Sequence, residues 1–309
     1  MFFEGSEKKV ELIATPSTTS LRALGHDFWR KLVHAANAEV LSHIGNSSLD
    51  AYLLSESSLF VWDDRLVMIT CGQSSLIKAV LKIINVLGAD AVAFISYQRK
   101  NECISQQQSS SFEQDVALLR QQIPGKAYRV GHLDSHHHYL YLSDTPYQAA
   151  SDDTTLELLM YHIQGNVADY LVSGEQTRQG IRERLAFHKL LADFTLDDHV
   201  FNPFGYSING ICEDKYFTVH ITPQESSSYV SFETNIRTTA LLEPIVTQLL
   251  HVLNPSSWDL IGFNEQQHLA QFPLHLCLGS CSIVSEQGYK IQFRHYQQLR
   301  HEVLVPEPL

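Results

Sequence analysis

The chain has 309 residues, of which 44% are hydrophobic and 18% charged, enough apolar material for one large domain or two ordinary ones. Its formal net charge is -12 and its basic residues form no stripe, which excludes nucleic acid as an expected partner. The apolar runs are too short to span a bilayer, the N-terminus is charged, and five cysteines show no disulfide framework, so we expect a cytoplasmic protein.

The first half of the chain predicts strands that alternate with amphipathic helices. Strands are expected at 1–13, at 59–70 as a hairpin, and at 91–97, 127–133 and 137–143. Helices are expected at 21–36, from Ser74 or Ser75 to Gly88, and from a capping box at Ser111 and Gln114 to about Ile123. The Gln- and Ser-rich segment 101–111 predicts a mobile loop.

Three consecutive histidines, His136 to His138, lie where the last of these strands begins. Adjacent strand residues point to opposite faces of a sheet, so the three side chains cannot share one ion well. We therefore expect no metal site there. The sequence also shows no Gly-rich phosphate loop, dinucleotide-binding fingerprint or zinc-ligand spacing.

The second half predicts a similar alternation. Strands are expected at 155–162, 200–208, 216–222 and 228–234 and within the last fifty residues, and helices at 165–172, 178–192 and 238–253. A strand, a turn, a strand and a helix occur at 59–87 and again at 200–253, which suggests an internal duplication. The alternating, one-sided strands favour antiparallel sheets covered by helices.

The stretch from Tyr52 to Phe60, YLLSESSLF, places a small polar core between two apolar strand halves. The hydroxyl of Ser57 lies in five-membered-ring geometry to the carbonyl of Glu56. On a strained backbone it can attack that carbonyl and turn the amide into an ester. Elimination from the ester would cut the chain and leave a pyruvoyl group at residue 57. A polar bulge or turn within a strand explains the same residues without any chemistry.

Several segments together resemble one family, the eukaryotic-type S-adenosylmethionine decarboxylases. They are FFEGSEK at 2–8, YLLSESSLF at 52–60, TCG at 70–72, TLELL at 155–159, FNPFGYSING at 201–210, HITP at 220–223 and YVSFETN at 229–235. They occur in the family's order, whereas the last seventy residues match poorly. The resemblance implies a single catalytic domain over 1–309, folded as a four-layer αββα sandwich of two antiparallel sheets with helices on the outer faces.

The resemblance also implies self-cleavage between Glu56 and Ser57, into a small (β) chain of residues 1–56 and a large (α) chain of residues 57–309. The pyruvoyl group derived from Ser57 would form a Schiff base with the substrate amine and accept the electrons released with CO2. No pyridoxal phosphate and no metal are expected. The product would be decarboxylated S-adenosylmethionine, the aminopropyl donor for spermidine and spermine.

Four further residues match processing or catalytic positions of the family. His220 would remove the α-proton from the ester intermediate, and Ser207 would hold that intermediate by hydrogen bonding. Cys71 would return a proton to the α-carbon after decarboxylation, because a thiol populates both protonation states near neutral pH. Glu7 is expected to contribute to substrate binding or processing. Taken singly, each of these residues is equally compatible with an ordinary strand or core position.

Other matched residues would bind the substrate. Phe3 and Phe201 match the rings that sandwich adenine, Glu4 and Leu54 lie in matched segments near the active site, and Gln224 replaces the glutamate that usually accepts from the ribose hydroxyls. A glutamine lacks the charge that strengthens such bonds. Decarboxylation of a basic amino acid, ornithine or arginine, is therefore an alternative.

An acidic group matches the buried site where putrescine activates animal members; its residues are Glu11, Asp153, Thr155, Glu157 and Glu233. Carboxylates gathered inside a protein need a cation. Lys9 stands where animal members have an apolar residue, and we hypothesise that its ammonium takes the place of the diamine. Ser96 and Gln98 replace other residues of that site, so activation by putrescine is not expected.

A further alternative comes from another class of protein, a non-catalytic paralogue that activates a partner decarboxylase. Such a paralogue should have lost the cleavage serine, the cysteine or the histidine. Ser57, Cys71, Ser207 and His220 are all present, which favours the enzyme. Its expected partner is the small-molecule substrate S-adenosylmethionine, and a homodimer of αβ units is compatible with the resemblance.

Overall fold

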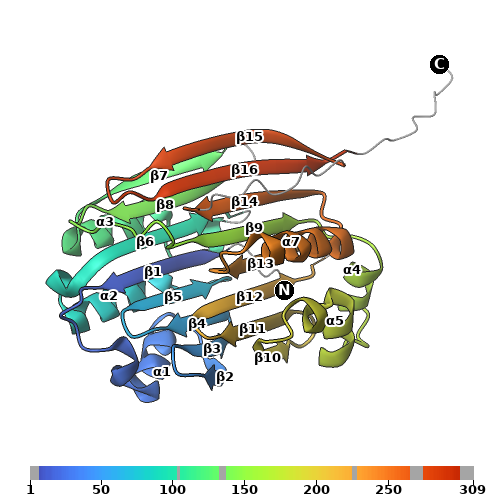
Figure 1. Ribbon diagram of the computed structural model, residues 1–309, viewed down its shortest axis with the longest axis horizontal. Helices are drawn as coiled ribbons and strands as arrows, with labels where there is room; N and C mark the ends of the chain where they lie inside the picture. The colour runs from blue at the N-terminus through green and yellow to red at the C-terminus, as the bar shows by residue number, and fades with distance from the viewer. Residues whose placement is uncertain (1–6, 103–104, 132–136, 225–227, 265–273, 300–309) are drawn as a thin grey trace.

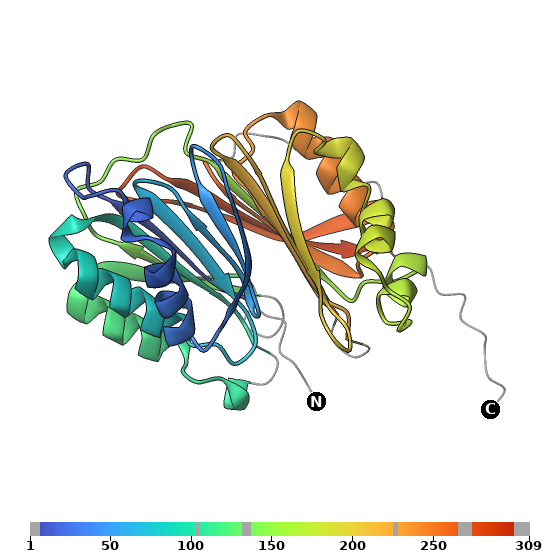
Figure 2. The ribbon, with the colours of Figure 1, turned by 90° about the horizontal axis from the view of Figure 1, so that it is seen from below.

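The computed structural model describes residues 7–102, 105–131, 137–224, 228–264 and 274–299. Within these ranges the strands form two eight-stranded antiparallel sheets that face each other, and helices cover both outer faces (Figures 1 and 2). The predicted four-layer αββα sandwich is therefore confirmed. Phe3 and Glu4 lie outside the described residues.

The first sheet contains the described strands up to residue 143. In spatial order they are β2 (Val40–Gly45), β3 (Asp50–Leu54), β4 (Ser57–Val61), β5 (Arg65–Thr70), β1 (Lys8–Ala14), β6 (Val92–Lys100), β8 (His137–Ser143) and β7 (Gly125–Gly131). Its outer face is covered by α1 (His26–Ala35), α2 (Leu76–Leu87) and α3 (Phe112–Gln122). Single 3-10 turns occur at Leu21–Leu24, Ala89–Ala91 and Ser105–Gln107.

The second sheet contains the described strands from residue 155 onward. In spatial order they are β10 (Thr195–Val200), β11 (Tyr206–Cys212), β12 (Lys215–Thr222), β13 (Tyr229–Thr234), β9 (Thr155–Tyr161), β14 (Ser257–Phe263), β16 (Lys290–Gln298) and β15 (His275–Val284). Its outer face is covered by α4 (Asn166–Leu171), α5 (Arg178–Leu185), α6 (Phe187–Leu190) and α7 (Thr239–Leu253).

The two sheets have the same topology. Each strand of the second sheet occupies the place of the strand eight positions earlier in the first, so that β12-β13-β9-β14 repeats β4-β5-β1-β6. The chain therefore builds the same half twice, as the suggested internal duplication predicts. The repeat places β4 and β5 in one sheet at positions equivalent to β12 and β13 in the other.

Strand β1 shows how the sequence separates the layers of the sandwich. Val10 and Leu12 pack against the helices of the first half, whereas Ile13 packs between the sheets with Phe94. Successive strand residues point to opposite faces, so the residues on the Ile13 face, including Lys9, are directed at the second sheet. The layer between the sheets consequently contains both apolar clusters and buried charges.

Several predicted elements are confirmed at the level of individual residues. The hairpin at 59–70 corresponds to β4 and β5, and α2 lies between Ser75 and Gly88. Helix α3 begins with the predicted capping box, because the Ser111 side chain accepts from the Gln114 backbone and the Gln114 side chain accepts from the Ser111 N–H.

Three predicted elements are wrong in their extent. The strand expected at 200–208 is interrupted between β10 and β11, where Pro203 has no N–H for the ladder and Gly205 takes a positive φ of 127°. The helix expected at 178–192 breaks at Ala186, which has a left-handed φ of 58°. The helix expected at 21–36 breaks at Gly25, with φ 80°.

Candidate active site

Residues 55 and 56 form the turn between β3 and β4, and Ser57 follows directly. Ser57 has a φ of 135°, a conformation that costs a residue with a side chain about 1–3 kcal/mol. Its Oγ atom is buried and has no hydrogen-bond partner among the described residues. Leu54 is buried and pairs with Ser57 in the ladder. An unpaired nucleophilic hydroxyl therefore lies on a strained backbone at the expected cleavage site.

The carbonyl oxygen of Glu56 is held by Cys71, at the end of the neighbouring strand β5. The backbone N–H of Cys71 donates to this oxygen at 2.9 Å, and Sγ of Cys71 lies 3.3 Å from it. Attack on a carbonyl moves negative charge onto its oxygen, and donors already in place stabilise that charge. The geometry suits the first step of chain cleavage.

The second sheet contributes a histidine to the same place. Nε2 of His220 lies 3.2 Å from Sγ of Cys71, and its Nδ1 lies 2.5 Å from Oγ of Ser207. Ser207 and His220 face each other across β11 and β12. The structure thus brings Glu56 and Cys71, from the first half of the chain, together with Ser207 and His220 of the second sheet.

Burial fixes the protonation states of the two groups. It lowers the pKa of His220 to about 4, so the imidazole is neutral and able to accept a proton at neutral pH. Burial also raises the pKa of the Cys71 thiol well above its ordinary value, and the nearby carboxyls of Glu56 and Glu7 add to the effect. The site therefore combines a neutral base with a protonated thiol.

Glu7 lies immediately before β1 and points towards β13. Ser231 donates a hydrogen bond to its carboxyl group, and the hydroxyl of Tyr229 lies 3.4 Å from it. Burial raises the pKa of Glu7 to about 8, with smaller contributions from neighbouring carboxylates. Because Ser231 is paired with His220 in the sheet, Glu7 lies one strand away from the imidazole.

Lys9 is the centre of one buried charge group. Its Nζ atom lies 2.8 Å from Glu157 and 3.0 Å from Glu233, and all three side chains are nearly fully buried. Tyr216 also donates a hydrogen bond to Glu233. Burial raises the pKa of Glu233 to about 7 even with the ammonium beside it. Lys9 thus makes the contacts that the hypothesis of a built-in cation requires.

Arg65 is the centre of a second charge group, which the sequence analysis missed. Its guanidinium binds both carboxylate oxygens of Asp153, at 2.6 and 2.7 Å, and lies 3.0 Å from Glu11. The Tyr289 hydroxyl donates to Asp153 at 2.5 Å. Thr155 is buried on β9, in register with Phe263. The four carboxylates of the predicted acidic site therefore divide between two cations.

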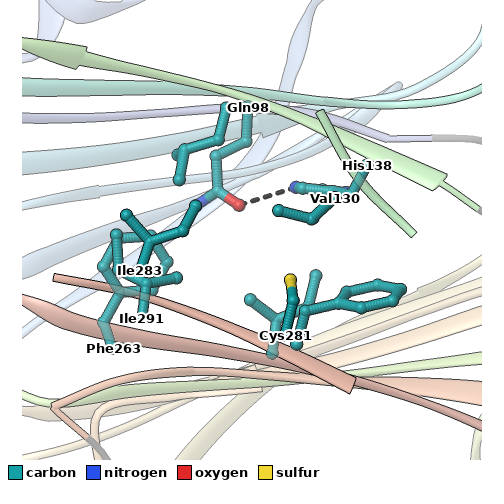
Figure 3. Close-up of a pocket in the computed structure, with 10 residues that line it drawn as sticks. Gln98, Val130, His138, Phe263, Cys281, Ile283 and Ile291 are labelled. Atoms are coloured by element: carbon teal, nitrogen blue, oxygen red, sulfur yellow. Dashed lines mark hydrogen bonds between the residues drawn. The ribbon is translucent and has the colours of Figure 1, made fainter. Parts of the chain in front are cut away.

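Gln98 connects the Lys9 group to His138. Gln98 donates to Glu157 at 3.1 Å, and its carbonyl oxygen lies 2.7 Å from Nε2 of His138 (Figure 3). The pair lies beside a small cavity whose other walls are formed by Val130, Leu140, Ile261, Phe263, Cys281, Ile283, Ile291 and Phe293. Among the described residues, which exclude His136, no cluster of His, Cys, Asp and Glu could hold a metal ion. The Oγ atom of Ser96 is buried nearby on the same strand.

Two of the predicted substrate-binding residues can be placed near His220. The ring of Phe201 lies 6.4 Å from that of His220, at an interplanar angle of 71°. Gln224 follows the end of β12, and its backbone N–H donates to Thr222. Both residues lie in segments that flank the strand ends carrying Ser207 and His220, at the same end of the second sheet.

A polar network joins the two sheets directly beside Ser57. Oγ of Ser58 donates to Asn209 at 2.6 Å and lies 3.1 Å from Oγ1 of Thr218, and Asn209 in turn donates to the Tyr52 carbonyl at 3.2 Å. Ser58 and Asn209 lie in the matched segments, but no role was predicted for them or for Thr218. The alternation of Asn209 and Thr218 with apolar neighbours on β11 and β12 was the available signal.

Comparisons with known proteins agree with this geometry. A profile of the family described as adenosylmethionine decarboxylase matches residues 1–307. The chain is 32% identical over 283 residues to the S-adenosylmethionine decarboxylase proenzyme of Leishmania donovani, covering 86% of this chain and 74% of that protein. It is 34% identical to the proenzyme of the same name from Xenopus laevis, over 86% of this chain and 84% of that one.

The fold is also found in a solved structure, described as Trypanosoma brucei AdoMetDC-delta26 monomer. It matches with a TM-score of 0.60 and 24% identity, covering 78% of this chain and 99% of that chain. At this identity the match supports the fold alone, whereas the profile and the relatives establish the relationship. The chain belongs to the adenosylmethionine decarboxylase family.

Proposed function

We propose that the protein cuts itself between Glu56 and Ser57 and then decarboxylates S-adenosylmethionine through the ketone left at residue 57. The observation that carries the proposal is the strained, unpaired Ser57 beside a Glu56 carbonyl held by Cys71. The names of the relatives, which call them proenzymes, agree with self-processing.

Processing would proceed in two stages, and His220 would be the base of the second stage. Oγ of Ser57 attacks the Glu56 carbonyl carbon, and the carbon–nitrogen bond breaks to give an ester and a free amine. His220, neutral and 3.2 Å from Cys71, takes the α-proton of residue 57. The Cβ–O bond then breaks and Glu56 leaves as a carboxylate. Water finally replaces the nitrogen of residue 57, and ammonia is released.

The ketone supplies an electron sink for the electrons released when an amine-linked amino acid loses CO2. Burial raises the pKa of Cys71, so the thiol keeps its proton at neutral pH and would deliver it at this point. Phe201 offers an aromatic face for adenine, with Phe3 as its proposed partner, and Gln224 and Glu4 lie in the segments that would contact the nucleoside. Glu7, held by Ser231, would orient either the ester or the substrate.

We further propose that Lys9 replaces a diamine activator. The ammonium lies at ion-pair distance from two carboxylates, and Arg65 contacts the other two. Each pair of buried carboxylates therefore has one fixed cation in this chain. Because the Lys9 ammonium already lies between Glu157 and Glu233, adding putrescine should not raise the activity.

The function is tested by the intact mass of the purified protein under denaturing conditions, together with CO2 release from S-adenosylmethionine. We expect two chains, the larger starting at residue 57 and lighter by the loss of ammonia, and saturable CO2 release. A stable uncut chain would point instead to a non-catalytic paralogue. The proposed substrate would be contradicted if the cut protein, offered S-adenosylmethionine together with ornithine or arginine, released CO2 only from the basic amino acid.

We also propose that the protein is a homodimer, formed through the open edge of the second sheet. Strand β15 is one of the two edge strands of this sheet, and Leu276, Leu278 and Val284 on it are at least half exposed. Light scattering should give the mass of two chains, and L278K should lower it to one. A single-chain mass for the unchanged protein would contradict the proposal; the related Trypanosoma brucei structure is described as a monomer.

A cytoplasmic location is proposed for the enzyme. Cys71, Cys212, Cys277 and Cys281 are free thiols, as expected in a reducing compartment. In the described part of the chain, no helix has the length and apolar character needed to cross a membrane. Fractionation of cells that produce the protein should recover it with cytoplasmic markers, and recovery in an oxidising compartment would contradict this location.

A further inference from the structure

We propose that Lys8 provides the counter-charge for the carboxylate that Glu56 becomes when the chain is cut. The inference rests on the proposed self-cleavage and deepens it, because it names the group that stabilises the leaving carboxylate. Lys8 would thereby accelerate the elimination step rather than the initial attack on the amide.

Lys8 occupies a buried position beside the turn that follows β5. Only 1% of the residue is exposed, and it lies on β1 directly opposite Thr70. Its Nζ atom donates to the carbonyl oxygen of Gly72 at 2.9 Å and to the side chain of Gln108 at 2.8 Å. Gly72 immediately follows Cys71, whose N–H holds the Glu56 carbonyl. Lys8 therefore binds the residue next to the one that holds the scissile carbonyl.

The ammonium of Lys8 has no counter-ion in the described parts of the chain. The nearby carboxylates of Glu102 and Asp115 bind Arg99 instead, at 2.5 and 2.8 Å. A buried cation is costly unless an anion neutralises it. An ammonium also has three N–H donors, and the contacts with Gly72 and Gln108 use two of them. Lys8 thus has both the charge and a donor to offer to a new anion.

Glu56 lies within the electrostatic reach of this ammonium. Burial raises the pKa of the Glu56 side chain to about 7, and Lys8 is the group that acts in the opposite direction. One oxygen of that side chain, Oε2, is buried without a hydrogen-bond partner among the described residues. An additional negative charge at residue 56 would therefore be poorly tolerated without a cation close by.

Elimination creates such a charge at this residue. His220 takes the α-proton of residue 57, the Cβ–O bond breaks, and its electron pair leaves on the α-carboxylate of Glu56. The preceding attack by Ser57 leaves no net charge on the Glu56 carbonyl group, because that group is neutral both in the amide and in the ester. A fixed cation beside Glu56 therefore favours the second step, where charge persists.

The test uses the full chain made by cell-free synthesis and sampled over time by intact mass, before and after neutral hydroxylamine. Hydroxylamine cuts an ester at residue 56 to give a hydroxamate, but leaves the amide intact. We expect Lys8→Met to complete cleavage about 10²-fold more slowly than the unchanged chain and to accumulate uncut, hydroxylamine-sensitive chain. Lys8→Arg keeps the charge and should restore much of the rate. Gln108→Leu removes the other acceptor, leaves the ammonium and should cleave normally.

The outcomes separate this inference from the function on which it rests. If the unchanged chain never cleaves, the proposed function fails and the inference fails with it. If it cleaves and Lys8→Met cleaves equally fast, only the role of Lys8 is refuted. A third outcome would also overturn the inference. If the Lys8→Met chain stays uncut and resists hydroxylamine, but unfolds in the same transition as the unchanged chain, then Lys8 acts before the ester forms.

Discussion

Ser57→Ala is expected to leave the chain in one piece and to abolish CO2 release from S-adenosylmethionine. The alanine has no hydroxyl to attack the Glu56 carbonyl, so no ester and no ketone can form. The folded state should lose little stability, because Oγ of Ser57 has no hydrogen-bond partner among the described residues. Intact mass and a CO2 release assay on the same preparation measure both effects.

Ser58→Ala is the matched control for this experiment. It removes the adjacent hydroxyl and its contacts with Asn209 and Thr218, which should cost about 1–3 kcal/mol of unfolding free energy. The variant should nevertheless cut itself between residues 56 and 57. Cleavage at that bond in Ser57→Ala, or a folded but permanently uncut Ser58→Ala, would contradict the assignment of Ser57 as the nucleophile.

Lys9→Met is expected to lower the free energy of unfolding by about 3–5 kcal/mol at neutral pH, and to reduce decarboxylation. The substitution leaves Glu157 and Glu233 buried without their cation. A carboxyl group whose pKa is raised by folding destabilises the folded state above its unfolded pKa. Without the ammonium, the pKa of Glu233 rises above about 7, its value in the unchanged protein, so the difference in unfolding free energy between variant and unchanged protein should narrow as the pH falls towards 7. Urea unfolding at several pH values measures it.

Putrescine and a conservative variant provide the controls for Lys9. Putrescine should partly restore the activity and stability of Lys9→Met, since a diamine can enter the space that the lysine side chain leaves. Lys9→Arg keeps the charge and should stay close to the unchanged protein. A severalfold increase in the turnover of the unchanged protein on addition of putrescine would refute the built-in cation.

Much of the fold could be predicted because the local signals agree with the final structure. The alternation on β1 predicted the end of that strand to within one residue, and the capping box at Ser111 predicted the start of α3. The interruption at 201–205 was missed because apolar and aromatic residues on both sides suggested a continuous strand. Pro203 and Gly205 were the contrary signals.

The sequence motifs predicted which residues belong to the site, but not which of them are in contact. Cys71 and His220 are 149 positions apart, and nothing in their spacing shows that they touch. Only the facing of two sheets brings them together. Arg65 was missed for a different reason, because it follows two aspartates at a hairpin turn and resembles a solvated loop residue. Its ion pair depends on Asp153, which lies 88 residues further along the chain.

The strand order has a consequence for a chain cut after residue 56. Strands β1, β2 and β3 would belong to the small fragment, whereas β4, β5 and β6 would belong to the large one. Because β1 is bonded to β5 on one side and to β6 on the other, the two fragments are interleaved within a single sheet. Neither piece can depart without unzipping the middle of that sheet. Covalent scission and physical separation are thus decoupled, and the broken backbone remains one folding unit.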